Sequence, residues 1–266
     1  MKKLSFNELK KDEIVRITQD NMVELMRFWS QCSDSFHVVE DEQIFRVKSA
    51  LPHPLFNNIL RTSINHDVTK SVIDIISDYK EQNVPFLWRI WDYDTPANIA
   101  EILLENGGQQ IPSTTLMAID LDFFHPLTEP YPGLTIQRVK NKQDGLKFSI
   151  CASGAFGIPA NLTNTMAELM AKQDQNTTNY VGFINGTAIA TASIFYHNDI
   201  AGIYNIGTLT EYQGKGIGLE MMTTILLKAK LDGYKTAILH STSAGKRLYE
   251  KLGFNTFGDM KQYLFA

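Results

Sequence analysis

Along residues 203–231 of the chain, the spacing of apolar residues changes from an alternating pattern to a helical one. An alternating apolar run begins at Ile203 and continues to Leu209, which is the period of a strand with one buried face. A polar turn follows. Apolar residues then recur at every third or fourth position, at Leu219, Met222, Ile225, Leu226 and Ala229. This stretch predicts a strand, a loop and a helix in direct succession.

The same patterns predict elements along the rest of the chain. Helical periods are found at residues 4–31, where Asp20 offers a cap, and at residues 67–80, 99–104, 144–153 and 162–171. Short apolar runs predict strands at residues 56–61, 85–91, 114–121, 134–139 and 236–239, whereas residues 36–47 are ambiguous. Two further runs flank Asn185-Gly186, a dipeptide typical of the turn between antiparallel strands. The mixture predicts an α+β fold, with a mixed α/β sheet.

A segment rich in proline at residues 126–133 predicts a linker between two domains, residues 1–125 and residues 134–266. The two halves share a pattern, because residues 85–121 and 234–265 each run strand, Ser/Thr turn, helix, glycine, strand. Strand–helix–strand units are common. Two interpretations of the smaller N-terminal α/β domain therefore stay open, an accidental likeness or a degenerate copy of the C-terminal fold.

Composition narrows the class of protein. Apolar residues make up 44% and charged residues 20%, as in folded globular proteins. The net charge is −4 and no basic stripe is present, so we expect no nucleic-acid partner. The two cysteines, Cys32 and Cys151, match no metal-ligand spacing, and we expect no metal. With neither an apolar run of membrane-spanning length nor a signal peptide in the sequence, we expect a cytoplasmic monomer or homodimer without a membrane partner.

The polar turn holds three glycines spaced by two, Gly214, Gly216 and Gly218. Glycines at the start of a helix leave backbone N–H groups uncovered, and the helix dipole adds about half a positive charge there, so the loop suits a phosphate. Glycines that serve packing alone are the alternative. A Walker loop is excluded by the spacing, and a dinucleotide loop would need glycine where Leu219 stands.

The run from Gln213 to Gly218 matches Gln/Arg-x-x-Gly-x-Gly/Ala, the acyl-coenzyme A signature of the GNAT N-acetyltransferase superfamily. Residues 248–254, read LYEKLGF, resemble the terminal helix signature of that family. The two motifs cover about the last half of the chain. The resemblance implies a GNAT fold for residues 134–266. The first half has no such loop, and Leu103 stands where the repeat would place Tyr249.

The resemblance also implies which residues bind the coenzyme. The pyrophosphate would be held by Gln213, Gly214, Lys215, Gly216, Ile217 and Gly218. The main chain of Ile206, Gly207 and Thr208 would line the pantetheine and polarise the thioester carbonyl. Gly207 fits a bulge or a close backbone approach, or else simple packing. Ser243, or its neighbour Thr242, stands where relatives often carry an asparagine, which puts that contact in doubt.

Tyr249 aligns with the tyrosine that many members of the family use as the general acid. The alternative interpretation is an aromatic side chain that serves packing alone. The base is less defined: His240, Glu211 and a water chain stay open. The resemblance implies an enzyme that moves an acetyl group from acetyl-coenzyme A, its cosubstrate, to a primary amine of a small-molecule or peptide acceptor. The alternative is a non-catalytic acyl-coenzyme A-binding or sensor protein.

Overall fold

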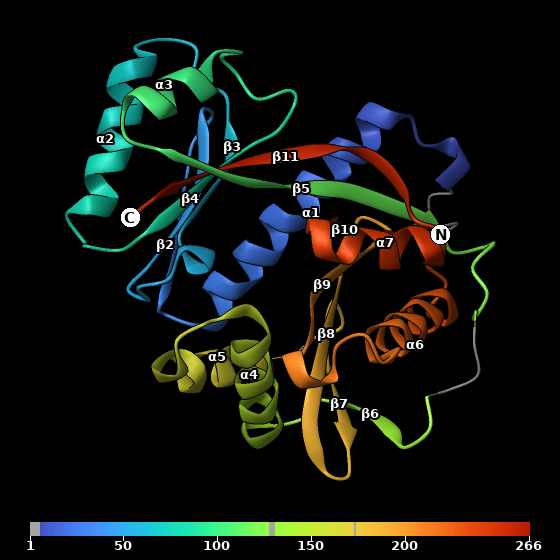
Figure 1. The fold of residues 1–266 in the computed structure, drawn as a ribbon. Helices are drawn as coiled ribbons and strands as arrows, with labels where there is room; N and C mark the ends of the chain where they lie inside the picture. The colour runs from blue at the N-terminus through green and yellow to red at the C-terminus, as the bar shows by residue number, and fades with distance from the viewer. Residues whose placement is uncertain (1–5, 128–130, 173) are drawn as a thin grey trace. The chain divides into compact units, whose positions relative to one another are not determined.

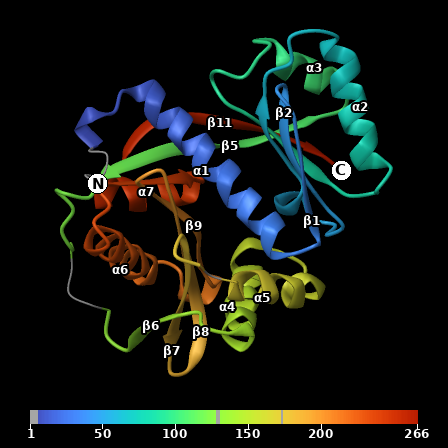
Figure 2. The same cartoon turned by 180° about the vertical axis from the view of Figure 1, so that it is seen from behind.

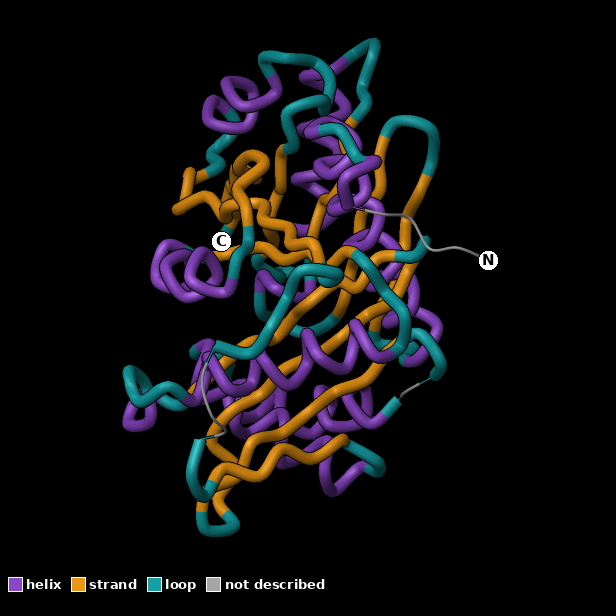
Figure 3. Tube along the Cα trace, turned by 90° about the vertical axis from the view of Figure 1, so that its right-hand side faces the viewer, coloured by secondary structure: helices purple, strands orange, loops and turns teal. Residues whose placement is uncertain are grey.

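The computed structural model describes residues 6–127, 131–172 and 174–266, and they form two compact units. The loop unit, which contains the glycine loop at residues 214–218, comprises the described residues within Met1–Ile14, Met117–His240 and Gly245–Thr256. The companion unit comprises Val15–Leu116, Ser241–Ala244 and Phe257–Ala266. Each unit has its own helices, strands and apolar core. Figure 3 shows that helices and strands are mixed along the described chain, which fits the predicted class.

The companion unit is built on a sheet of the order β1-β2-β3-β4-β11-β5. Its strands are β1 (Phe36–Glu40), β2 (Ile44–Ser49), β3 (Asn58–Thr62) and β4 (Phe86–Ile90), with most of β11 (Asn255–Phe265) and of β5 (Gln109–Asp120). Its helices are most of α1 (Lys11–Cys32), α2 (Val68–Lys80) and α3 (Ile99–Glu105). Strands β3 and β4 run parallel, and Trp88 of β4 and Tyr79 of α2 are fully buried in the core.

The loop unit is built on a sheet of the order β5-β10-β9-β8-β7-β6. Its strands are the end of β5 with β6 (Leu134–Arg138), β7 (Thr177–Ile184), β8 (Thr187–His197), β9 (Ile200–Thr208) and β10 (Thr236–Ser241). Its helices are α4 (Lys142–Phe156), α5 (Thr163–Ala171), α6 (Ile217–Leu231) and most of α7 (Ser243–Leu252). Helices α4 and α5 lie on one side of strands β7 to β9, and α6 lies on the other (Figure 1, Figure 2).

Strands β5 and β11 are each divided between the two units. The first part of β5 belongs to the companion unit, whereas residues 117–120 belong to the loop unit, where β5 is the neighbour of β10. Conversely, β11 leaves the loop unit after Thr256, and its residues Lys261 to Phe265 pair antiparallel with β4. The companion unit thus contains most of β11 from the second half of the sequence, and the loop unit contains the last four residues of β5 from the first half.

The two strand–helix–strand repeats, at residues 85–121 and 234–265, end their helices in the same way. Gly107 after α3 and Gly253 after α7 have φ of +92° and +98°, a left-handed conformation that glycine adopts without strain. In both, the next N–H donates to a carbonyl in the last helical turn: Gly108 to Leu103 at 2.8 Å, and Phe254 to Tyr249 at 3.0 Å. The local geometry of the repeat therefore agrees in both copies.

Most predicted elements are found close to their expected positions, and the turn at Asn185-Gly186 joins β7 and β8. The cap expected at Asp20 is wrong, because Asp20 lies inside α1, whose apolar face continues past it. The ambiguous residues 36–47 form β1 and part of β2. Of the predicted linker, residues 128–130 lie outside the described residues. The division into 1–125 and 134–266 stays a prediction, and the compact units differ from it before Val15, in β5, at Ser241–Ala244 and in β11.

Candidate active site

Strands β9 and β10 are joined by a parallel ladder that ends part of the way along β9. The ladder runs from Ile200 opposite Thr236 to Ile203 opposite Leu239. Residues 204–208 of β9 continue past its end, and of these Tyr204, Gly207 and Thr208 are paired with β8 on the other side. The two parallel strands therefore present a stretch of main chain where the ladder stops, at the carboxyl ends of both strands.

A bulge interrupts the pairing of β9 with β8 at this place. The register shifts between Thr191 and Ser193, and Asn205 has a φ of +52°. Beyond the bulge, Ile206 packs against the core cluster that contains α6. Gly207 points the other way, toward α4, where a Cβ would lie only 2.9 Å from Ala155 and 3.0 Å from Phe156. Gly207 thus marks a close approach of α4, and the bulge itself lies at Asn205.

The glycine loop follows a short 3-10 turn, η4 (Thr210–Tyr212). The Gln213 side chain donates to the Thr208 carbonyl at 3.0 Å, which ties the loop to the end of β9. Gly214 and Gly216 have φ of +72° and +88°, where a side chain would be strained. No side chain caps the N-terminus of α6, and residues 213–216 are exposed. The loop is therefore open to an anion at the start of a 15-residue helix.

The remaining predicted loop residues differ in their surroundings. Lys215 is exposed, with its amino group 5.3 Å from the centre of the Tyr212 ring. Ile217 is buried in the core, so only its main chain faces the loop. A Cβ on Gly218 would meet Leu248 of α7 at 3.5 Å, an ordinary contact. Gly218 is thus a position where alanine fits, in agreement with the Gly/Ala alternative of the sequence signature.

Tyr249 lies on α7 within the same core cluster as α6. Its ring packs edge-on against Phe254, with ring centres 5.9 Å apart, and the side chain is 8% exposed. Burial raises the pKa of Tyr249 to about 12. The hydroxyl therefore keeps its proton at neutral pH, as a proton donor must.

His240 directly follows Leu239, the last ladder residue of β10, and Tyr204 follows the last ladder residue of β9. The two rings lie near each other at the ladder end, tilted by 38°, with centres 6.1 Å apart. Ser243 is the exposed first residue of α7 and falls in the companion unit. The structure thus places Tyr204 beside the expected His240. No sequence spacing singled out Tyr204, because it reads as an ordinary strand aromatic.

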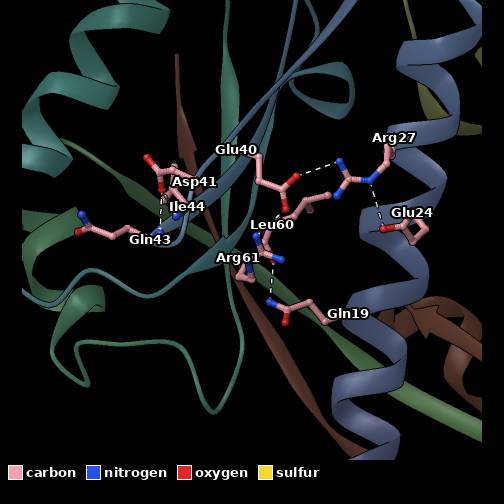
Figure 4. Close-up of polar contacts among 9 residues, drawn as sticks. All are labelled: Gln19, Glu24, Arg27, Glu40, Asp41, Gln43, Ile44, Leu60 and Arg61. Carbon is pink, nitrogen blue, oxygen red and sulfur yellow. Dashed lines mark hydrogen bonds and ion pairs between the residues drawn. The ribbon is translucent and has the colours of Figure 1, made fainter.

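The companion unit also has a parallel strand pair, in which β3 runs beside β4, but its own groups occupy the end of β3. The Leu60 carbonyl accepts from the Gln19 amide at 2.8 Å (Figure 4) and from the Trp91 indole at 3.0 Å. The Thr62 N–H donates to Asp94 at 3.3 Å. No glycine occurs in the loop at residues 63–67. These main-chain groups at the end of β3 therefore have hydrogen-bond partners within the companion unit.

The loop unit thus combines a parallel strand pair, whose ladder stops beside a bulge, with a glycine loop at the start of a helix. Residues 155–254 match the family model described as "Acetyltransferase (GNAT) family". These residues thus form a GNAT acetyltransferase domain, as the two motifs predicted. The family indicates acyl transfer from an acyl-coenzyme A, with acetyl-coenzyme A as its typical cosubstrate.

Solved structures share the fold over nearly the whole chain. A GCN5-related N-acetyltransferase from Kribbella flavida has a TM-score of 0.68 and 15% identity, and covers 94% of each chain. A functionally unknown conserved protein from Staphylococcus epidermidis has a TM-score of 0.64 and 15% identity, over 89% of this chain and 96% of that one. A tandem GNAT protein from the clavulanic acid biosynthesis pathway has a TM-score of 0.59 and 10% identity, over 97% and 96%.

The tandem relative supports the two-domain layout, so the fold class expected from the sequence is confirmed. No curated protein matches the chain. Within the described ranges, no helix is long and apolar enough to cross a membrane. In the same ranges, His, Cys, Asp and Glu side chains form no group of three or more that could hold a metal ion.

Proposed function

We propose that the loop unit transfers an acetyl group from acetyl-coenzyme A to a primary amine of a small-molecule or peptide acceptor. The observation that carries the proposal is the end of the β9–β10 ladder beside the open glycine loop. The loop is the proposed pyrophosphate site, because residues 213–216 are exposed and no side chain caps the N-terminus of the helix that follows. The main chain of residues 206–208 is the proposed lining for the pantetheine.

Each proposed proton transfer is assigned to a residue of the loop unit. When bound, acetyl-coenzyme A supplies the acetyl thioester. The Tyr249 hydroxyl is protonated at neutral pH and is the proposed donor of the proton that the departing thiolate takes up. His240, at the end of β10, is the proposed acceptor of a proton from the amine. Gly207 leaves its main chain close to α4, where the acceptor amine is proposed to approach.

The phosphate role of the loop is tested by two substitutions that add the same methyl group. Gly216→Ala places a Cβ at a φ of +88°, at a cost of about 1–2 kcal/mol, and covers the N–H groups. Gly218→Ala lies inside α6 at an ordinary contact distance. We expect Gly216→Ala to weaken coenzyme A binding about tenfold or more, which is about 1.4 kcal/mol, and Gly218→Ala to change it less than threefold.

The measurement is calorimetric titration with coenzyme A, with thermal melting to confirm that both variants are folded. Equal affinity in Gly216→Ala and the wild type would refute the phosphate role. Release of free thiol from acetyl-coenzyme A with a panel of primary amines tests the transfer itself. Saturable binding with no thiol release for any amine would indicate a binding protein in place of an enzyme. The cytoplasmic location and the monomeric or dimeric state stay predictions from the sequence.

A further inference from the structure

We propose that Asn205 is a positioning residue for the acyl transfer, and that Ser193 and Asn179 hold it in place. The proposal rests on the proposed function. It concerns the bulge in β9, which decides which groups of residues 206–208 face the coenzyme and which face the acceptor. None of these three residues belongs to the glycine loop or to the proton-transfer pair.

The three side chains form a chain of hydrogen bonds in which every group donates to the next. The Asn205 amide donates to the Ser193 hydroxyl at 3.0 Å, and that hydroxyl donates to the Asn179 side-chain oxygen at 2.5 Å. The Asn179 amide then donates to the Met170 carbonyl at 2.8 Å. Because all donors point the same way, each bond polarises the next, and the removal of one member weakens the others.

A second hydrogen bond holds the main chain of the bulge. The Thr191 hydroxyl donates to the Asn205 carbonyl at 2.8 Å. Asn205 is thus fixed both by its side chain and by its carbonyl. Ser193, Asn179 and Thr191 are at most 5% exposed, so these bonds are shielded from competing water. Breaking them would leave buried polar groups without partners, which makes the arrangement specific.

The identity of the residue at the bulge also matters for its backbone. A φ of +52° is strained for most side chains, and asparagine is among the few non-glycine residues that adopt it readily. Asparagine at position 205 therefore serves two purposes at once. It accepts the left-handed conformation that the bulge requires, and its amide reaches the buried hydroxyl of Ser193.

The bulge controls the faces of the residues that follow it. Successive side chains of a strand point to opposite faces of the sheet, and a bulge inserts one extra residue into the strand. If that residue were paired regularly, every side chain beyond it would point to the opposite face. Without the bulge, Ile206 would turn toward α4, and Gly207 would turn toward the α6 side. The main chain that is proposed to polarise the thioester carbonyl would move with them.

The chain of bonds also reaches α5, because Met170 is close to the end of that helix. Helices α4 and α5 lie on the side of the sheet where the acceptor is proposed to bind. The bulge is thus tied to that helix layer, and not to the glycine loop. We therefore expect changes at Asn205 to affect the chemical step more than the binding of the coenzyme.

Three substitutions separate the two purposes of Asn205. Asn205→Gly keeps the left-handed backbone but removes the amide, and Asn205→Ala removes both. Asn185→Ala is the matched control, because Asn185 has a φ of +50° in the β7–β8 turn and takes no part in the network. Asn185→Ala should lower the melting temperature about as much as Asn205→Ala does, with kcat unchanged.

We expect kcat to fall about tenfold in Asn205→Gly and about a hundredfold in Asn205→Ala, since a shift near 1 Å in a positioning group costs on the order of 10²-fold. The Kd for coenzyme A should change less than about threefold, because the loop at residues 213–218 is intact. Ser193→Ala should resemble Asn205→Gly, and the double variant should be no worse than either, as expected for one network.

A second measurement does not depend on turnover. Hydrogen exchange followed by mass spectrometry should show faster exchange of the main-chain amides of residues 204–208 in Asn205→Gly and Ser193→Ala than in Asn185→Ala. Wild-type kcat and wild-type exchange in Asn205→Ala would overturn the positioning role. A loss of kcat matched by an equal loss of coenzyme affinity would overturn it too. Absence of thiol release in the wild-type protein would instead refute the proposed function.

Discussion

Tyr249→Phe tests the proposed general acid, because it removes the hydroxyl and leaves the ring that packs against Phe254. The stability of the protein at neutral pH should change by about 1 kcal/mol or less, since only one hydroxyl is lost. If the hydroxyl supplies the proton to the departing thiol, kcat should fall by about a hundredfold, the lower range for one general acid. Affinity for coenzyme A should stay close to that of the wild type.

The raised pKa of Tyr249 gives the same substitution a second consequence. Burial raises the pKa to about 12, against about 10 for an exposed tyrosine in the unfolded chain. Between these values the unfolded chain loses the proton while the folded protein keeps it, so the free energy of unfolding falls as pH rises. Two pH units correspond to about 3 kcal/mol. The Phe variant lacks this ionisation. Above pH 10, the free energy of unfolding of the wild type should therefore fall relative to that of the Phe variant.

The assays are thiol release under conditions where chemistry limits the rate, and urea unfolding at pH 8 to 11. Tyr263→Phe is the control, because Tyr263 is buried in the companion unit and has no proposed role. Between pH 7 and 10, loss of the Tyr249 proton should not lower the wild-type rate. Normal turnover in Tyr249→Phe, with the alkaline stability change present, would show that Tyr249 is a buried packing residue only.

Two further predictions concern stability. A fragment of residues 131–266 lacks residues 117–120 of β5, which lie beside β10, so we expect it to fold poorly. Co-expression of residues 1–127 should restore its solubility, as measured by soluble yield and circular dichroism. A well-folded fragment would show that the loop unit does not need residues 117–120. Burial raises the pKa of Asp94 to about 7, although the N–H groups of Trp91 and Thr62 oppose the shift. The unfolded chain ionises near pH 4 while the folded protein keeps the proton, so the free energy of unfolding should fall by up to about 4 kcal/mol from pH 4 to 7, and Asp94→Asn should abolish this fall in urea unfolding.

The parts of the fold that local signals govern could be predicted from the sequence. The turn at Asn185-Gly186 and the loop before α6 depend on glycines and on neighbouring residues, and both are found where expected. The family followed from the same loop and from residues 248–254, and the family model confirms it. The roles of the individual site residues stay predictions.

Other features could not be predicted, because they depend on partners that are distant in the sequence. Asn205 reads as one polar residue in an apolar run, and its hydrogen-bond partners are the buried hydroxyl groups of Thr191 and Ser193 on another strand. The pairing of β11 with β4 joins residues that are far apart in the sequence, and hydrophobic periodicity does not indicate which strands pair. The hydrogen bond at the end of β3, which the Leu60 carbonyl accepts, likewise comes from a distant residue, Gln19 of α1.

The division of β5 and β11 has a consequence for how the protein is made. During synthesis from the N-terminus, β4 (Phe86–Ile90) leaves the ribosome long before its neighbour at residues 261–265 exists. In the same way, β5 is made before the β10 strand beside which it lies. Both nascent sheets would then wait with an open edge, a state prone to wrong pairing. The two units are therefore expected to complete their folding in one late step, and not one after the other.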